Sequence, residues 1–190
     1  MNDCEFLSRR CFLTVTSTLA GSAMLGTLDV VSGAESATAN PVVIRGPHLF
    51  DMLDALGTGK SSHKTLGPVA QKIRANPHVS LKIVIGEDDI CGPCEWWDHE
   101  KSQCKRGLEK YPQDNANSLT SDGNAIRVLG LKPGEVKNAD ELYRQIQAKV
   151  TKKVFAEEVC VACRLVDKCK ETYPRKIDAA VKALAEPHPQ

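Results

Sequence analysis

The chain has 190 residues, of which 42% are apolar and 26% are charged, and its formal net charge is +1. These values are ordinary for a globular protein, and they argue against a protein built to bind a polyanion such as a nucleic acid. Aromatic residues make up only 5% of the chain, so we expect a core of Leu, Val, Ile and Ala and a mainly helical structure.

Residues 1–39 are predicted to be an export signal. Residues 8–13, S-R-R-C-F-L, open an apolar run that is too short and too polar for a stable membrane span, and small residues up to Ala39 follow. The arginine pair is similar to the twin-arginine signal S-R-R-x-F-L-K, with Thr14 in place of the lysine. An ordinary secretion signal or an uncleaved anchor is the alternative. We expect the mature protein to begin near Asn40 and to be periplasmic or otherwise exported.

Residues 40–190 are predicted to form a single α+β domain, mostly helical, with a small two-stranded or similar sheet. In chain order we expect a strand over residues 40–45, a helix over 48–56, a helix over 66–75 and a strand over 79–85. A turn-rich stretch over residues 111–123 precedes predicted helices over 122–129, from 139 to 150, from 152 to 159 and from 176 to 185.

The cysteines of the mature chain fall into two triplets, C-x2-C-x9-C and C-x2-C-x5-C. The first comprises Cys91, Cys94 and Cys104, and the second comprises Cys160, Cys163 and Cys169. A C-x2-C turn can direct two sulfurs at one metal, so two such turns can supply four ligands. We therefore predict two Cys-rich loops brought together around one metal site. Cys91, Cys94, Cys160 and Cys163 are the expected ligands, Cys104 and Cys169 are in reserve, and His48 and His99 are further candidates.

Three alternatives compete for these cysteines. Residues 91–94, C-G-P-C, have the letters of a thioredoxin redox dithiol, but Ile90 stands where that motif has tryptophan, and the later strands have no counterpart. The first triplet with His99 has the spacing of a zinc knuckle, which binds single-stranded nucleic acid, but the usual glycines are missing. Six cysteines in an oxidising compartment could also form three disulfides in any of about 15 connectivities.

Motifs spread from about Ile44 to Thr172 point to one family. They are R-G-P-H-L (45–49), D-D-I-C (88–91) with Cys94 and Cys104, L-G-L-K-P-G (129–134), and C-V-A-C-R (160–164) with Cys169. In this order they resemble the domain-of-unknown-function 1284 family, small bacterial and archaeal proteins thought to bind an iron–sulfur cluster. The family's pattern near the start is close to R-G-H-H-L-L-C, so Pro47 and Asp51 are departures, and Asp51 puts a carboxylate in place of a cysteine.

The predicted function is electron transfer or redox sensing by an exported metalloprotein with an iron–sulfur cluster, most simply a four-iron cluster. Its expected partner is another redox protein, with no nucleic acid and, after signal cleavage, no membrane. The alternatives are a structural zinc module for protein interaction, a disulfide-stabilised secreted domain and a thiol oxidoreductase. The sequence has no recognisable catalytic constellation, such as a serine nucleophile elbow or H-E-x-x-H, so an enzyme is the less favoured reading.

Overall fold

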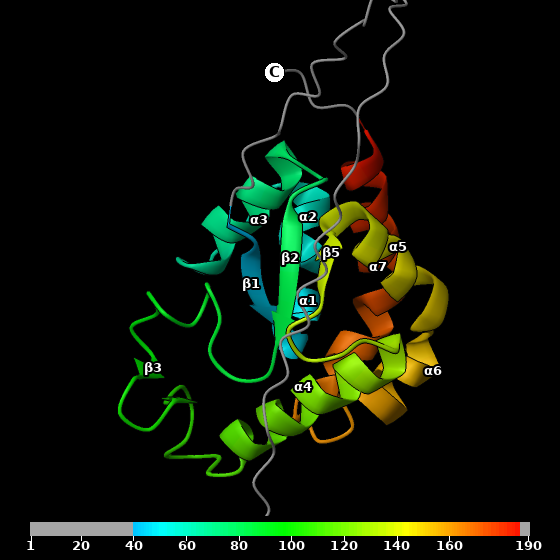
Figure 1. Ribbon diagram of the computed structural model, residues 1–190. Coiled ribbons are helices and arrows are strands. Elements are labelled where there is room, and N and C mark those ends of the chain that lie inside the picture. The colour runs from blue at the N-terminus through cyan, green and yellow to red at the C-terminus, as the bar shows by residue number, and fades with distance from the viewer. Residues whose placement is uncertain (1–39, 187–190) are drawn as a thin grey trace, which may run out of the picture. The chain divides into compact units, whose positions relative to one another are not determined.

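The computed structural model describes residues 40–186, and the predicted export signal lies outside them. The described chain confirms the predicted class, a mostly helical α+β domain (Figure 1). Its main sheet has three strands in the order β1 (Val42–Arg45), β2 (Ser80–Val84) and β5 (Val136–Asn138). β1 runs parallel to β2, and β5 runs antiparallel to it. Because β1 and β2 are parallel, the segments that leave their carboxyl ends emerge at the same edge of the sheet.

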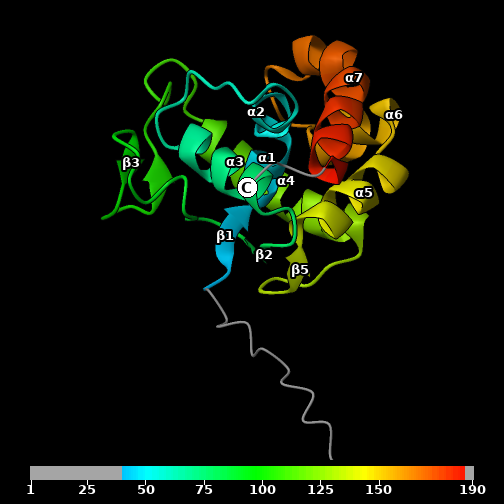
Figure 2. The same ribbon diagram turned by 90° about the horizontal axis from the view of Figure 1, so that it is seen from above.

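Helices pack on one face of this sheet (Figure 2). α1 (Gly46–Asp51) and α2 (Leu53–Thr58) follow β1 at once, and α3 (Leu66–Ala75) leads back to β2. A two-stranded ribbon, β3 (Trp97–Asp98) and β4 (Gln103–Cys104), comes next, followed by α4 (Asp114–Leu129), α5 (Ala139–Lys149), α6 (Lys152–Val154), the π-helical turn η1 (Phe155–Val159) and α7 (Val166–Ala185). In Figures 1 and 2, the β3–β4 ribbon lies beyond the β1 edge of the sheet, and helices α5, α6 and α7 lie beyond the β5 edge.

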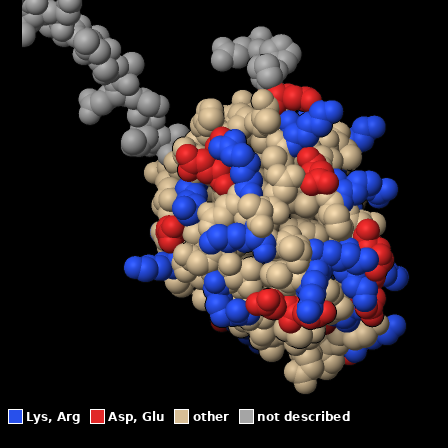
Figure 3. Space-filling model, turned by 90° about the vertical axis from the view of Figure 1, so that its right-hand side faces the viewer, with Lys and Arg blue, Asp and Glu red and all other residues tan. Residues whose placement is uncertain are grey.

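Among the described residues, the helices are too short or too polar to cross a membrane. The face that carries α5, α6 and α7 shows lysines and arginines interspersed with acidic residues (Figure 3). Some of these charges are paired, as between Lys152 of α6 and Glu171 of α7, whose charged atoms are 2.6 Å apart. Exposed pairs of this kind contribute little to stability, so the hydrophobic core holds the helices together.

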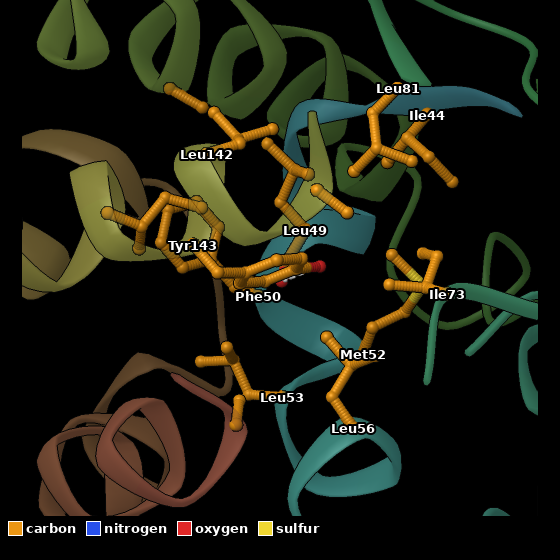
Figure 4. Close-up of a cluster of buried hydrophobic side chains, with 14 of the residues drawn as sticks. Ile44, Leu49, Phe50, Met52, Leu53, Leu56, Ile73, Leu81, Leu142 and Tyr143 are labelled. Atoms are coloured by element: carbon orange, nitrogen blue, oxygen red, sulfur yellow. Dashed lines mark hydrogen bonds between the residues drawn. The ribbon is translucent and has the colours of Figure 1, made fainter. Parts of the chain in front are cut away.

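The core lies between the sheet and the helices, and it fixes the position of α1. Ile44 and Leu81 from the two parallel strands lie in it with Leu49 of α1 and Leu142 of α5 (Figure 4). Tyr143 of α5 is fully buried, and its hydroxyl donates to the carbonyl oxygen of Leu49 at 3.2 Å. A buried hydroxyl without a partner is costly, so this bond ties α1 to α5.

The start of α1 also packs closely on α4. A Cβ atom at position 46 would lie 2.8 Å from the Cα atom of Asp122 and 2.9 Å from the Cβ atom of Ala125, so this approach requires glycine. Beside it, Arg45 and Asp122 form a buried bidentate pair, with Nε donating to Oδ1 at 3.1 Å and Nη2 donating to Oδ2 at 2.7 Å. The close contact of Gly46 and the ion pair between Arg45 and Asp122 together hold the end of β1 against α4.

The structure differs from the sequence prediction in three helices. The single helix expected over residues 48–56 is instead two short helices, α1 and α2, that meet at Met52. α4 begins at Asp114, although residues 111–123 are rich in turn formers, because tertiary contacts such as the Asp122 ion pair override local propensity. α7 begins at Val166, ten residues before the predicted start, and continues through Pro174. Predicted strands and the helix over residues 66–75 agree with β1, β2 and α3.

Two glycine-to-alanine substitutions should have opposite effects on stability. Gly46→Ala should lower the free energy of unfolding by about 1–3 kcal/mol, because the new methyl group overlaps the backbone of α4. Gly123→Ala, inside α4 with no atom within 4 Å of the added methyl group, should raise it by about 0.5–1 kcal/mol, since alanine favours the helix. Urea unfolding of both variants measures this, and equal effects would contradict the close packing of α1 on α4.

Candidate metal site

All six cysteines of residues 40–190 line one cavity of about 1220 Å³. They come from two loops, residues 91–104 after β2 and residues 160–169 between η1 and α7. The structure gives all six as free thiols. Arg45, at the carboxyl end of β1, and His48 and Asp51 of α1 line the same cavity. Two distant segments of the chain therefore bring their cysteines to the walls of one cavity, although among the described residues no three cysteine sulfurs lie within 4.8 Å of one another.

The two C-x2-C segments form the same kind of turn. The N–H group of Cys94 donates to the carbonyl oxygen of Cys91 at 2.9 Å, and the N–H group of Cys163 donates to that of Cys160, also at 2.9 Å. In the second turn, the N–H group of Leu165 also donates to the Cys163 sulfur at 3.4 Å. A hydrogen bond of this kind favours the charged thiolate, which is the form that binds metals.

A buried carboxylate, Asp88, holds the first loop in place. Its Oδ1 atom accepts the N–H groups of Ile90 (3.0 Å) and Cys91 (2.8 Å), and its Oδ2 atom accepts that of Arg45 (2.9 Å) and lies 2.8 Å from Nδ1 of His48. Burial tends to raise the pKa of Asp88, but the His48 side chain and these backbone bonds outweigh burial and hold the pKa below its ordinary value. Asp88 thus joins the end of β1, helix α1 and the first cysteine turn.

The β3–β4 ribbon returns the third cysteine of this loop to the cavity. Trp97 pairs with Cys104 across the ribbon, and the N–H group of Trp97 donates to the carbonyl oxygen of Cys94 at 2.9 Å. Trp97 is 5% exposed and lines the cavity, whereas Trp96 is 45% exposed. The indole Nε1 of Trp97 is buried without a hydrogen-bond partner among the described residues. Since a buried N–H group normally has an acceptor, this indole is a donor available to a bound group.

The second loop is positioned by aromatic packing. The π-helical turn η1 ends at Cys160, whose N–H group donates to the carbonyl oxygen of Phe155 at 2.9 Å. Phe155 stacks on Tyr173 of α7, with ring centroids 4.4 Å apart and planes 9° apart, and Phe50 meets Phe155 edge-on at 5.5 Å. Single π-helical turns are frequent at functional sites. All three rings line the cavity and give it an apolar wall.

An arginine anchors the other end of the second loop. Arg164 donates through Nε to Oδ2 of Asp114, in the first turn of α4, at 2.8 Å. Its guanidinium carbon lies 4.3 Å from the ring centroid of Tyr111, in cation–π geometry. These contacts connect the second cysteine loop to the segment that follows the first.

Two of the thiols are held in the neutral form. Burial first, and then the charge of Asp88 and a hydrogen bond to it, raise the pKa of Cys91 to about 12. Burial first, and then Cys163, Asp51 and Cys169, raise the pKa of Cys160 to about 12. A redox dithiol needs a lowered thiol pKa, so this environment disfavours the thioredoxin alternative. A metal cation reverses the effect, because it stabilises the thiolate.

The three histidines near these loops are placed differently. His48 lines the cavity beside Asp88, with 19% of its side chain exposed. His99 is 66% exposed, does not line the cavity, and lies 3.4 Å from Glu87 through Nδ1. The structure therefore does not bring His99 to the three cysteines with which it shares knuckle spacing. His63, for which the sequence offers no motif, also lines the cavity.

The remaining charges of the cavity are mixed. Asp51 is open to the cavity but surrounded by protein, and this dehydration raises its pKa, although His48, His63 and Arg45 partly offset the effect. Because the charge of Asp51 raises the pKa of Cys160 and Cys169, its carboxylate lies near the second triplet. Basic side chains also line the cavity: Lys60, Arg106, Arg164 and Lys176.

The sequence of residues 61–169 matches a family described as protein of unknown function (DUF1284). The chain belongs to this family. The matched region contains both cysteine triplets, Asp88 and His63, whereas His48 and Asp51 precede it. No curated protein and no solved structure matches the chain.

The raised thiol pKa values should appear in the stability of the metal-free, reduced protein. From about pH 9 toward pH 12 the unfolded thiols lose their protons while the folded Cys91 and Cys160 keep them, so stability falls as pH rises. Each thiol contributes a slope of up to about 1.4 kcal/mol per pH unit. Urea unfolding at several pH values should give a shallower slope for Cys160→Ser than for the wild type, and equal slopes would show that Cys160 is not a buried neutral thiol.

Proposed function

We propose that this protein binds one iron–sulfur cluster in the cysteine-lined cavity and acts as an exported electron carrier or redox sensor. The observation that carries this proposal is that six free cysteines from two separate loops line a single cavity. Cys91, Cys94, Cys160 and Cys163 are the proposed ligands, and Cys104 and Cys169, which line the same cavity, are in reserve. Four thiolates are the usual ligand set of such a cluster.

The cavity suits a cluster in three further respects. Phe50, Phe155 and Tyr173 give it an apolar wall that excludes water. The unpartnered indole N–H group of Trp97 and the N–H group of Leu165 are donors of the kind that bond to cluster and cysteine sulfurs. The basic lining side chains offset the negative charge of a thiolate-ligated cluster.

When bound, the cluster supplies one-electron chemistry. The cysteines of this protein would bind the cluster, and the side chains that line the cavity would set its reduction potential. The buried thiols Cys91 and Cys160 have raised pKa values, whereas a cysteine nucleophile needs a lowered one. A carrier or sensor of electrons is therefore favoured over a catalyst.

The predicted twin-arginine export signal agrees with the same proposal. That resemblance lies in residues 8–14, outside the described structure, and such a route carries folded proteins. A cluster held by residues far apart in sequence is present only in the folded chain, so a folded route is the one that delivers it loaded. Fractionation of cells expressing the full chain tests this step, with an Arg9→Lys, Arg10→Lys double variant expected to remain in the cytoplasm.

The cluster is tested on the anaerobically purified mature chain by its visible spectrum, with iron, acid-labile sulfide and zinc assayed on the same sample. A brown protein with matched iron and sulfide is expected. A colourless protein with one equivalent of zinc would identify a structural zinc module instead. A protein that binds neither and has no free thiols would be the disulfide-stabilised domain.

Substitutions in each loop test whether one centre is shared. Cys94→Ser and Cys163→Ser should each abolish cluster binding, because each removes a ligand of the same cluster, and both should destabilise the folded chain, since site assembly contributes folding free energy. Ser118→Ala, at a cavity-lining residue that carries no sulfur, should leave the iron content unchanged. If each cysteine variant kept about half of the wild-type iron, the loops would hold separate centres and the shared site would be wrong.

Trp97 should tune the potential of the cluster. Trp97→Phe keeps an aromatic ring in the buried position but removes the unpartnered Nε1 donor. Hydrogen bonds to cluster sulfurs stabilise the more negative, reduced state, so the variant should have a lower reduction potential. Trp96→Phe, at an exposed neighbour, is the matched control and should leave the potential unchanged. Equal potentials for Trp97→Phe and wild type in protein-film voltammetry would show that the indole does not donate to the cluster.

A further inference from the structure

We infer that His48 is also a metal ligand of this cavity, binding through Nε2, and that Asp88 is the positioning residue that orients it. The inference rests on the proposed metal-binding function and assigns the site a nitrogen donor beside Cys91. Donor atoms of His48, Asp88 and Cys91 all lie within 4.8 Å of one another. The hydrogen bonds of each residue decide which of the three can bind a metal.

Asp88 is saturated and is not the ligand. Its two oxygen atoms already accept three backbone N–H groups and lie against His48 Nδ1, at 2.8–3.0 Å. A carboxylate offers about four lone-pair positions, so none is left for a metal. Drawing Asp88 to a metal would also leave buried backbone donors without acceptors.

His48 has its outer nitrogen free. Asp88 already acts as the acceptor of three backbone N–H groups, so it also faces His48 as an acceptor, and Nδ1 of His48 is the donor of this 2.8 Å contact. With its N–H at Nδ1, the ring has Nε2 left to offer a lone pair to a metal. A carboxylate that binds one imidazole nitrogen while the other binds a metal is the usual arrangement around metal-ligating histidines.

The second histidine of the cavity has the opposite tautomer. Nδ1 of His63 accepts the N–H groups of Thr65 at 3.4 Å and Leu66 at 3.3 Å, at the start of α3. A backbone N–H group only donates, so the lone pair of His63 is on Nδ1 and its Nε2 carries the proton. Burial, His48 and Arg106 lower the pKa of His63 and keep the ring neutral. His63 can donate a hydrogen bond into the cavity but cannot bind a metal through Nε2.

The helix that carries His48 is firmly placed. His48 and Asp51 are three residues apart in α1 and both line the cavity, while Leu49 between them is fully buried. Two contacts hold this helix in place: the hydrogen bond from Tyr143 to Leu49, and the close packing of Gly46 on α4. A ligand held in this way is preorganised.

Pulsed electron paramagnetic resonance on the reduced, iron-loaded chain tests the inference, using protein with natural histidine and protein with ¹⁵N-labelled histidine. A strong nitrogen coupling that changes with the label is expected in wild type and in His63→Ala, and it should be lost in His48→Ala. Asp88→Asn should lower metal affinity about 10- to 100-fold while keeping the coupling. If the centre is zinc, cobalt substitution and X-ray absorption read the same nitrogen ligand.

The outcomes separate this inference from the proposed function. A wild-type chain with its full metal content and no histidine coupling would overturn the assignment of His48 and leave the cysteine site standing. Coupling that disappears in His63→Ala but persists in His48→Ala would show that His63 is the ligand and would overturn the assignment of His48. A wild-type chain that binds no iron, zinc or cobalt would overturn both. The wild-type signal decides whether any histidine is a ligand and does not depend on the folding of a variant. The iron-loaded His48→Ala and His63→Ala chains then decide which histidine it is.

Discussion

The site depends first on one buried carboxylate, Asp88. A charged group away from water must have its lone pairs filled, and Asp88 fills them from two segments that are far apart in the sequence, residues 45–48 and residues 90–91. The parallel pairing of β1 and β2 makes this possible, because it places Arg45 and the loop after β2 at the same edge of the sheet. The cysteine turn, the histidine and the sheet consequently share one reference point, and none of them can move without leaving a buried donor unpaired.

The second cysteine loop reaches the same cavity by other means. Its position follows from the stacking of Phe155 on Tyr173, from the π-helical turn that ends at Cys160, and from the anchoring of Arg164 on α4. Dispersion and apolar burial replace the hydrogen-bond network of the first loop. The two loops still end in C-x2-C turns closed by the same hydrogen bond, so two different packing solutions present two similar pairs of sulfurs.

Sequence reasoning could predict what depends on local pattern. Alternation and helical periodicity predicted β1, β2 and α3, and the spacing of the cysteines singled out the two loops that the structure places around one cavity. The sequence pattern does not predict contacts between residues that are far apart in the chain. Residues 114–121 of α4 lie in a stretch of turn formers, and local pattern does not show the contacts that Arg45, 77 residues from Asp122, and Gly46 make with this helix. The sequence offered both His48 and His99 as candidate ligands. Of these two, the fold brings His48 to the cavity, against Asp88 40 residues away, because strand pairing rather than spacing sets that contact.

The electrostatics of the cavity restrict which ions it can hold. In the metal-free protein, burial keeps Cys91 and Cys160 protonated well above neutral pH, with the pKa of each near 12. An ion must displace these protons to bind, and the strength of its bond to sulfur has to repay that loss. Hard ions such as Mg²⁺ and Ca²⁺ prefer oxygen and bind thiolates weakly, so they cannot do this. Iron in an iron–sulfur cluster and zinc can, because their bonds to thiolate are strong. Under the proposed function, the same burial that makes the metal-free site poor in thiolates therefore favours ions that bind sulfur strongly over Mg²⁺ and Ca²⁺.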